Sequence, residues 1–217
     1  MAIAGRQTKT FDDKTILNPK IGSIAAHGEE FVLALSPDQE MVEILRLPDQ
    51  PYAADADAAF ATQIGKPGSY VGRLHGAKAM ALTRDGNTFL VLEEVNNRIQ
   101  AFNTNGVPVK YFGGTASEIA LQQWPEDAGK QLTYLDMSLE YAGYLYVLSY
   151  EDAGSDPNQY RLDIYTPGGL KLARTRGVSA GRLTVDQWRA VYTLNYELLV
   201  WSAQHPEPSV SLWGTSQ

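Results

Sequence analysis

The stretch DGNTFLVLEEVNNRIQAFNTNGVPVKYFG, residues 85–113, decides the fold. A turn precedes the apolar run Phe89-Leu90-Val91-Leu92, and a polar corner follows it. An alternating segment, residues 98–102, then leads through Asn105-Gly106 to a further segment, residues 107–112. Asn-Gly between two such segments is typical of the tight turn of a β-hairpin. The stretch therefore predicts three strands joined by turns.

The apolar run has three relatives along the chain. Leu92 ends this run, and Leu35, Leu148 and Leu194 end runs of the same kind, at successive spacings of 57, 56 and 46 residues. Each run is preceded by another predicted strand and followed by an alternating one. The preceding strands are residues 21–26, 77–83, 133–139 and 182–185, and the alternating strands are residues 41–45, 98–102, 161–165 and 209–213. This repeated order predicts a meander that occurs about four times.

Glycine marks the first turn of the repeat. Gly28, Gly86 and Gly143 lie there in the first three copies, and glycine reaches positive φ without a steric penalty. The fourth copy has Asp186-Gln187-Trp188 instead. The pattern predicts a tight hairpin at each of the first three turns and a different turn in the fourth copy.

Repeated four-stranded antiparallel meanders of about 40–50 residues are typical of a β-propeller. The apolar runs suit strands that are packed between neighbouring blades on both faces. We therefore expect an all-β fold, a single β-propeller domain of about four blades over residues 1–217. The blades are expected at roughly residues 19–64, 76–113, 132–175 and 180–213. A β-sandwich is the alternative architecture.

Closure of the ring is a separate expectation. The last copy has three predicted strands, and residues 5–11 form a strand-compatible segment with no place in the first meander. We expect this segment to be the fourth strand of the last blade, which would close a four-bladed ring. The alternative is an incomplete ring that needs a partner, missing chain or self-association to cover its apolar faces.

The opening stretch also carries a family pattern. Its features are the entry Gly86-Asn87, the strand Asn96-Asn97-Arg98-Ile99-Gln100-Ala101-Phe102 and the turn Asn105-Gly106. They resemble an NHL repeat, in which Glu93 or Glu94 would match the acidic residue after the second strand. Residues 161–169 match more loosely. The resemblance implies a propeller, typically of six blades in that family, whose fold hosts adaptors, RNA binders and enzymes alike.

Composition narrows the classes of partner and compartment. The chain has 18 basic and 25 acidic side chains, a formal net charge of −7, so we do not expect nucleic acid as the main partner. There is no cysteine, which excludes disulfides and thiolate metal sites. No segment approaches the ~18 apolar residues of a membrane span, and the start MAIAGRQTKTFDDK does not resemble a secretory signal. We expect a cytoplasmic protein without a membrane segment.

Two long segments separate the predicted blades. They are residues 51–72 and residues 115–130. In the second, residues 117–124 are predicted to form a short helix with Ser117 as its N-cap and Pro125 at its end. We expect these segments to decorate the ring.

Carboxylates recur just after the apolar runs, where the corners of a propeller lie on one face. Together with neighbouring tyrosines they make the predicted binding set, which is Asp38, Glu93, Glu94, Tyr150, Glu151, Tyr196 and Glu197. An acidic collar of this kind would attract a cation or a basic partner. The simpler expectation is that Glu94 pairs with Arg98, and Glu151 or Asp152 with Arg161, inside a blade.

The sequence favours a non-catalytic scaffold that binds a protein partner, with no cofactor. The alternative is a propeller hydrolase or lyase with a metal at the channel mouth, which would need His75 to converge with Glu94 or Glu151. A third reading, from the stretch LTVDQWRAVYTLNYE, is a structural subunit of a larger bacterial assembly such as a phage-tail-like particle.

Overall fold

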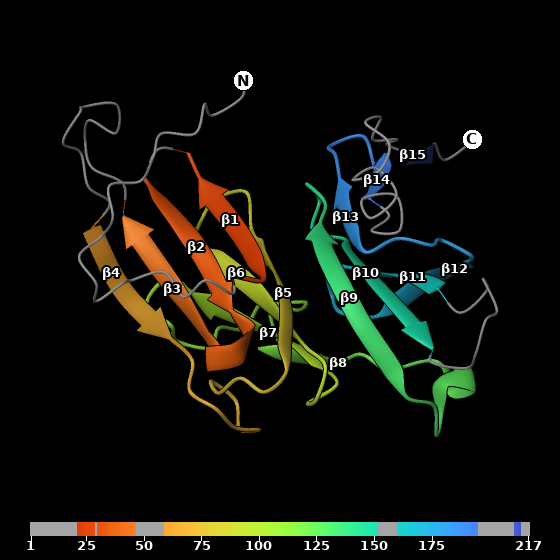
Figure 1. The fold of residues 1–217 in the computed structure, drawn as a ribbon, viewed down its shortest axis with the longest axis horizontal. Coiled ribbons are helices and arrows are strands. Elements are labelled where there is room, and N and C mark those ends of the chain that lie inside the picture. The colour runs from red at the N-terminus through yellow and green to blue at the C-terminus, as the bar shows by residue number, and fades with distance from the viewer. Residues whose placement is uncertain (1–20, 29, 47–58, 152–159, 195–210, 214–217) are drawn as a thin grey trace, which may run out of the picture.

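The computed structural model describes residues 21–28, 30–46, 59–151, 160–194 and 211–213, and the side chains of all of these except 59–62 and 211–213. Figure 1 shows strands throughout this part of the chain, with two single-turn 3₁₀ helices. These short helices are η1 (Pro37–Gln39) and η2 (Pro125–Asp127). No helix in the described ranges is long or apolar enough to cross a membrane.

The strands form four antiparallel sheets, here called blades 1 to 4, each built in chain order. Blade 1 is β1 (Ser23–His27), β2 (Phe31–Ser36), β3 (Met41–Arg46) and β4 (Ala59–Ile64). Blade 2 is β5 (Ala77–Leu82), β6 (Thr88–Glu93), β7 (Arg98–Asn103) and β8 (Glu118–Ala120). Blade 3 is β9 (Leu132–Leu139), β10 (Leu145–Glu151), β11 (Tyr160–Tyr165) and β12 (Lys171–Arg176). Blade 4 is β13 (Arg182–Val185), β14 (Val191–Leu194) and β15 (Ser211–Trp213).

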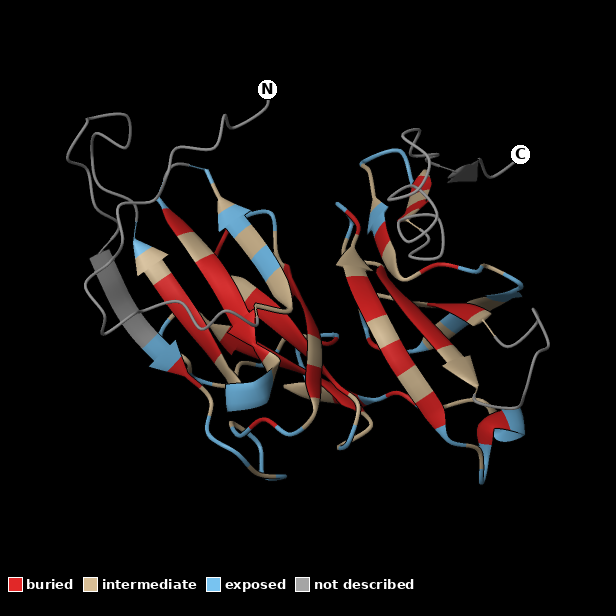
Figure 2. Cartoon of the chain, in the orientation of Figure 1, coloured by how far each residue is buried: buried red, intermediate tan, exposed pale blue. Residues whose placement is uncertain are grey.

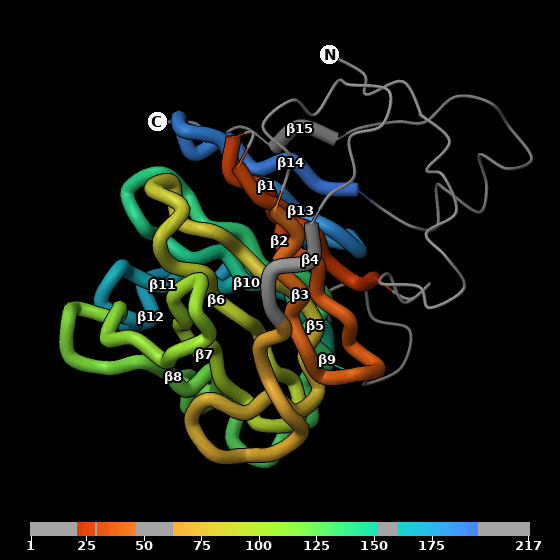
Figure 3. The backbone as a smooth tube through the Cα atoms, turned by 90° about the vertical axis from the view of Figure 1, so that its left-hand side faces the viewer, coloured from red at the N-terminus to blue at the C-terminus, as the bar shows by residue number. Residues whose placement is uncertain are grey.

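The strand registers confirm that the four anchoring leucines are equivalent. The residues that face Leu35, Leu92, Leu148 and Leu194 on the first strands are Ser23, Ala79, Asp136 and Arg182. The first strands β1, β5, β9 and β13 all contribute to the lining of one central cavity of about 570 Å³. Figures 1 and 3 show the blades placed around it. The protein is therefore a β-propeller, as predicted.

Apolar cores fill the spaces between consecutive blades. Leu33 and Leu35 of blade 1 pack with Phe89 and Val91 of blade 2. The opposite side of β6 packs on blade 3 through Leu90 and Leu92, and Tyr146 and Leu148 of blade 3 pack with Leu183 and Val191 of blade 4. The second strands of blades 2 and 3, β6 and β10, are thus buried on both faces (Figure 2). This explains why the second strand is a continuous apolar run.

The outer edge of blade 2 differs from the prediction. Its fourth strand is β8, so the blade extends past Gly113, and residues 107–112 make only isolated bridges. Pro108 has no N–H to donate to a ladder, whereas Ser117 O accepts from Ala101 N at 2.8 Å and Asn97 O accepts from Leu121 N at 2.9 Å. The helix predicted over residues 117–124 is wrong, because this segment completes the sheet.

The first turn of each blade follows the glycine pattern. Gly28, Gly86 and Gly143 have φ of 52°, 71° and 88°. In blade 4 the positive φ, 67°, falls on Arg189, and the Asp186 carboxylate accepts from the backbone N–H groups of Trp188 and Ala190, both at 2.9 Å. An aspartate-capped turn therefore replaces the glycine turn. The N-terminal strand expected at residues 5–11 lies outside the described residues.

Candidate functional site

Three carboxylates of the predicted acidic collar, those of Glu93, Glu94 and Glu151, form ion pairs. Glu93 is 0% exposed, and its Oε1 lies 3.0 Å from Nε of Arg98, while its Oε2 accepts from Asn96 Nδ2 at 2.6 Å and from the backbone N–H of His75 at 3.0 Å. Arg98 also donates to Glu118 Oε2 at 2.8 Å. The partner of Arg98 is thus Glu93 and not Glu94, and Glu93 stabilises the corner of blade 2 from within. It cannot contact a partner at the surface.

Glu94 and Glu151, two other predicted carboxylates, also form ion pairs. Glu94 pairs with Lys78 at 2.8 Å and accepts from the backbone N–H of Tyr134 at 3.2 Å. Glu151 pairs with Lys130 at 3.1 Å and with Arg161. Asp38 is exposed on η1, and Tyr150 is half-buried beside Tyr160, with 5.8 Å between ring centroids. Tyr196 and Glu197 lie outside the described residues.

His75 is held by blade 1. Its Nδ1 lies 2.6 Å from Glu40 Oε1, and the same oxygen accepts from the backbone N–H of Gly76 at 3.2 Å. Glu94 and Glu151 are bound by cations of their own blades, so these three residues do not form a shared set of ligands. Within the described ranges no group of three or more His, Asp or Glu side chains could hold a metal ion.

A second buried ion-pair network supports blade 3 (Arg161, Asp127, Arg174 and Asp163). Asp127 Oδ1 lies 2.6 Å from Arg161 Nη1, its Oδ2 lies 2.7 Å from Arg174 Nη2, and Arg174 also pairs with Asp163. Burial would raise the pKa of Asp127, but the hydrogen bonds and charges of Arg174 and Arg161 outweigh it and hold the pKa below its usual range. The network ties η2, β11 and β12 together.

The opposite face, where the first turn of each blade lies, carries exposed aromatic rings and guanidinium groups. We call it the hairpin face and define it by residues 27–28, 30–31, 83–88, 140–144 and 186–190. Trp188 is 77% exposed and Tyr141 is 59% exposed on it. Arg84 of blade 2 lies over the Tyr141 ring of blade 3, with 4.0 Å from Cζ to the centroid. The turns of blades 2 and 3 lie side by side in Figure 3.

Arg189 repeats this arrangement between blades 4 and 3. Its Cζ lies 4.9 Å from the centroid of the Tyr144 ring, and its Nε lies 3.3 Å from Glu140 Oε1. Cation–π contacts of this kind hold an aromatic ring and a guanidinium in a fixed orientation. Two arginines and three aromatic rings (Tyr141, Tyr144 and Trp188) therefore lie on or beside the first turns of blades 2 to 4, and we call this set the ridge.

A hollow of about 540 Å³ lies beside this ridge, between blades 1 and 2. Its lining includes His27, Arg46, Asp85 and Asn105. Asp85 accepts from Thr83 Oγ1 at 2.6 Å and from Asn87 Nδ2 at 2.9 Å, and these bonds keep the pKa of its carboxyl below the ordinary value. The hairpin face thus combines projecting aromatic rings with a polar hollow.

Sequence reasoning missed Arg84, Trp188 and Arg189 as surface groups. A signal was present in the turns. Arg84 stands next to Asp85, Tyr141 stands next to Glu140, and Trp188-Arg189 follow two residues after Asp186. Only the fold shows that these turns share a face.

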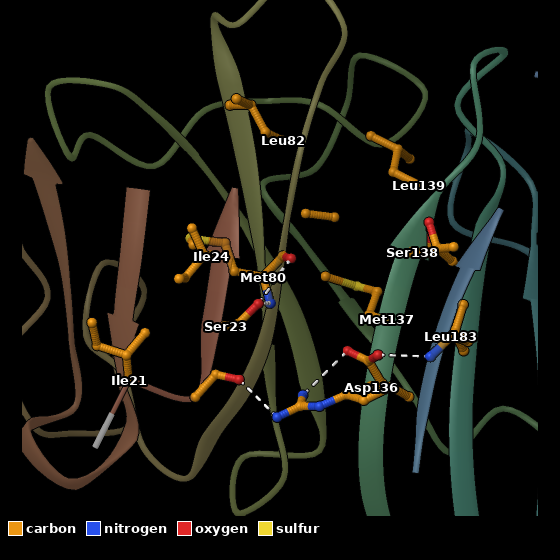
Figure 4. Close-up of a pocket in the computed structure, with 14 residues that line it drawn as sticks. Ile21, Ser23, Ile24, Met80, Leu82, Asp136, Met137, Ser138, Leu139 and Leu183 are labelled. Atoms are coloured by element: carbon orange, nitrogen blue, oxygen red, sulfur yellow. Dashed lines mark hydrogen bonds and ion pairs between the residues drawn. The ribbon is translucent and has the colours of Figure 1, made fainter. Parts of the chain in front are cut away.

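The central cavity is the other candidate (Figure 4). Asp136 Oδ2 accepts from the backbone N–H of Leu183 at 2.8 Å, and its Oδ1 lies 3.6 Å from Arg182 Nη1. Burial raises the pKa of Asp136 above its ordinary value, against the pull of these donors. The remaining labelled lining residues are mostly apolar, so Asp136 and Arg182 act here as a polar link between blades 3 and 4.

Comparison with known proteins supports the fold alone. No protein-family model matches the sequence, and no curated protein matches it. Among solved structures, a Bacteroides fragilis protein has a TM-score of 0.56 at 14% identity. The match covers 95% of this chain and 51% of that protein. A Lactobacillus plantarum protein has a TM-score of 0.55 at 12% identity, covering 89% and 54%. Hydrazine synthase of Kuenenia stuttgartiensis has a TM-score of 0.51 at 14% identity, covering 90% and 46%. The chain therefore spans about half the length of these structures.

Proposed function

We propose that this protein is a non-catalytic interaction module that binds a protein partner through its hairpin face. The observation that carries the proposal is the ridge, in which Arg84 lies over Tyr141, Arg189 lies over Tyr144, and Trp188 is 77% exposed. Tryptophan, tyrosine and arginine are the residues most enriched in the energetic centres of protein interfaces. Because the rings stand on tight turns between packed blades, they lose little conformational entropy on binding.

Two further features agree with this role. Residues 85–113 resemble an NHL repeat, and the members of that fold include adaptors, which supports this proposal. The net charge of −7 disfavours a nucleic-acid partner, and Glu94 and Glu151 of the collar are already bound to cations. In contrast, Tyr141, Trp188 and both arginines of the hairpin face are exposed. The proposed partner therefore offers apolar pockets for rings and carboxylates for the arginines.

The experiment compares three immobilised proteins with the lysate of the source organism: the natural sequence, Trp188→Ala and Tyr70→Ala. Tyr70 is the matched control, because it is 80% exposed and its backbone carbonyl binds Arg98 at the opposite face. We expect a partner whose retention falls about tenfold or more with Trp188→Ala and is unchanged with Tyr70→Ala. Equal effects of the two substitutions on every retained protein would contradict the proposal.

A further inference from the structure

Equivalent residues on the four inner strands differ sharply in exposure. They are Ile24, Met80, Met137 and Leu183, each one position after the residue that faces an anchoring leucine. Met80, Met137 and Leu183 are 4%, 4% and 8% exposed, and each belongs to the core shared with the preceding blade. Ile24 is 64% exposed, and no residue of β1 is buried (Figure 2). The face of blade 1 that is turned away from blade 2 is therefore open at β1.

Blade 4, at the other end of the ring, is open on the opposite side, the one that would face a following blade. Tyr192 and Leu194 on β14 lie on the side that in the earlier blades packs against the following blade. Their equivalents are Leu33, Leu90 and Tyr146, and Leu35, Leu92 and Leu148, none of which is more than 5% exposed. Tyr192 and Leu194 are only half-buried. Among the described residues, blade 4 thus presents a following face, and blade 1 a preceding face, without the apolar core that joins every consecutive pair.

A hydrogen bond joins blade 4 to blade 1. Arg182 Nη2 donates to Gly22 O at 2.8 Å across the central cavity (Figure 4). The apolar cores of the described residues join blades 1 and 2, blades 2 and 3, and blades 3 and 4. Blade 4 and blade 1 therefore touch through this bond without the apolar packing found at the other three junctions.

We propose that a second copy of this chain covers both open ends, with blade 4 of each copy packed on blade 1 of the other. The junction would repeat an interface that the chain already makes three times. Two copies supply eight blades, within the range of known propellers. A twofold axis closes the pair and leaves no open end.

The first test measures the mass in solution of the full chain over a dilution series, for the natural sequence, Ile24→Lys and Val107→Lys. Val107 is the control because it is 54% exposed in the loop after β7, away from both open faces. We expect a dimer of 23.9 kDa chains whose dissociation constant rises about 30-fold or more with Ile24→Lys and is unchanged with Val107→Lys. A monomer at every concentration, or a dimer insensitive to Ile24→Lys, overturns the proposal.

The second test uses the absence of natural cysteine. In the double variant Ile24→Cys, Leu194→Cys, a short bismaleimide joins the open face of blade 1 to that of blade 4. Bands at twice the chain mass in a denaturing gel support the paired ring. Cross-linking within one chain, or none, overturns it. Both tests concern ring closure and are independent of any partner on the hairpin face.

Discussion

Arg161 and Asp127 form an ion pair of 2.6 Å with both side chains fully buried, although 34 residues separate them along the chain. A buried charge is tolerated only when it is paired and hydrogen-bonded, and here Asp127 serves both Arg161 and Arg174. The pair joins the segment that precedes blade 3 to its third strand, so it fixes how the connection from blade 2 enters blade 3.

We expect Asp127→Ala to lower the free energy of unfolding by about 3–5 kcal/mol, because it leaves buried guanidinium groups short of a partner. The neighbouring carboxylate of Glu126 is the control: it lies 3.6 Å from Arg174 Nη1 and is 45% exposed. Glu126→Ala should cost about 0–1 kcal/mol. Urea denaturation measures both, and equal losses would refute the assignment of the buried network to Asp127.

The contribution of Asp127 should depend on pH. Its native pKa lies below the ordinary value near 4, so the stabilisation is complete above that value and is lost as the pH falls through the native pKa. The difference in unfolding free energy between the natural protein and Asp127→Asn should be largest at neutral pH and shrink below about pH 4. A difference that stays constant down to acid pH would show that packing, not charge, carries the effect.

Gly169 provides a steric prediction. Both Gly169 and Gly114 have positive φ, 78° and 70°, so alanine strains the backbone at each by about 1–2 kcal/mol. A Cβ on Gly169 would collide with Ile119 Cγ2, whereas a Cβ on Gly114 meets nothing within 4 Å. Gly169→Ala should therefore lower stability by about 1–3 kcal/mol more than Gly114→Ala, measured by thermal or urea unfolding. Equal losses would mean that β8 shifts freely against the turn of blade 3.

The metal content of the protein distinguishes an interaction module from an enzyme that uses His75 as a metal ligand. Because its Nδ1 is engaged by Glu40, and Glu94 and Glu151 are engaged by cations, we expect elemental analysis of the purified protein to find no stoichiometric transition metal or calcium. His75→Ala should leave the metal content unchanged. One metal ion per chain that disappears with His75→Ala would favour the enzyme over the interaction module.

The sequence by itself determined the blades. Alternation, continuous apolar runs and turn glycines are local properties, so the anchoring leucines and the turns at Gly28, Gly86 and Gly143 could be placed without coordinates. The sequence-based prediction for β8 was wrong because the local pattern of residues 117–124 suits a helix. The segment instead pairs with the free edge of β7, and the presence of that edge is not a local property of the sequence.

Only the tertiary structure decided which charges meet and which surfaces stay open. Glu93 turned inward to Arg98, Arg84 came to lie on Tyr141 in the next blade, and Ile24 remained exposed where its equivalents are buried. Each outcome depends on the distance between residues of different strands or blades. That distance is set by how the sheets pack round the cavity, and the repeat pattern alone does not specify it.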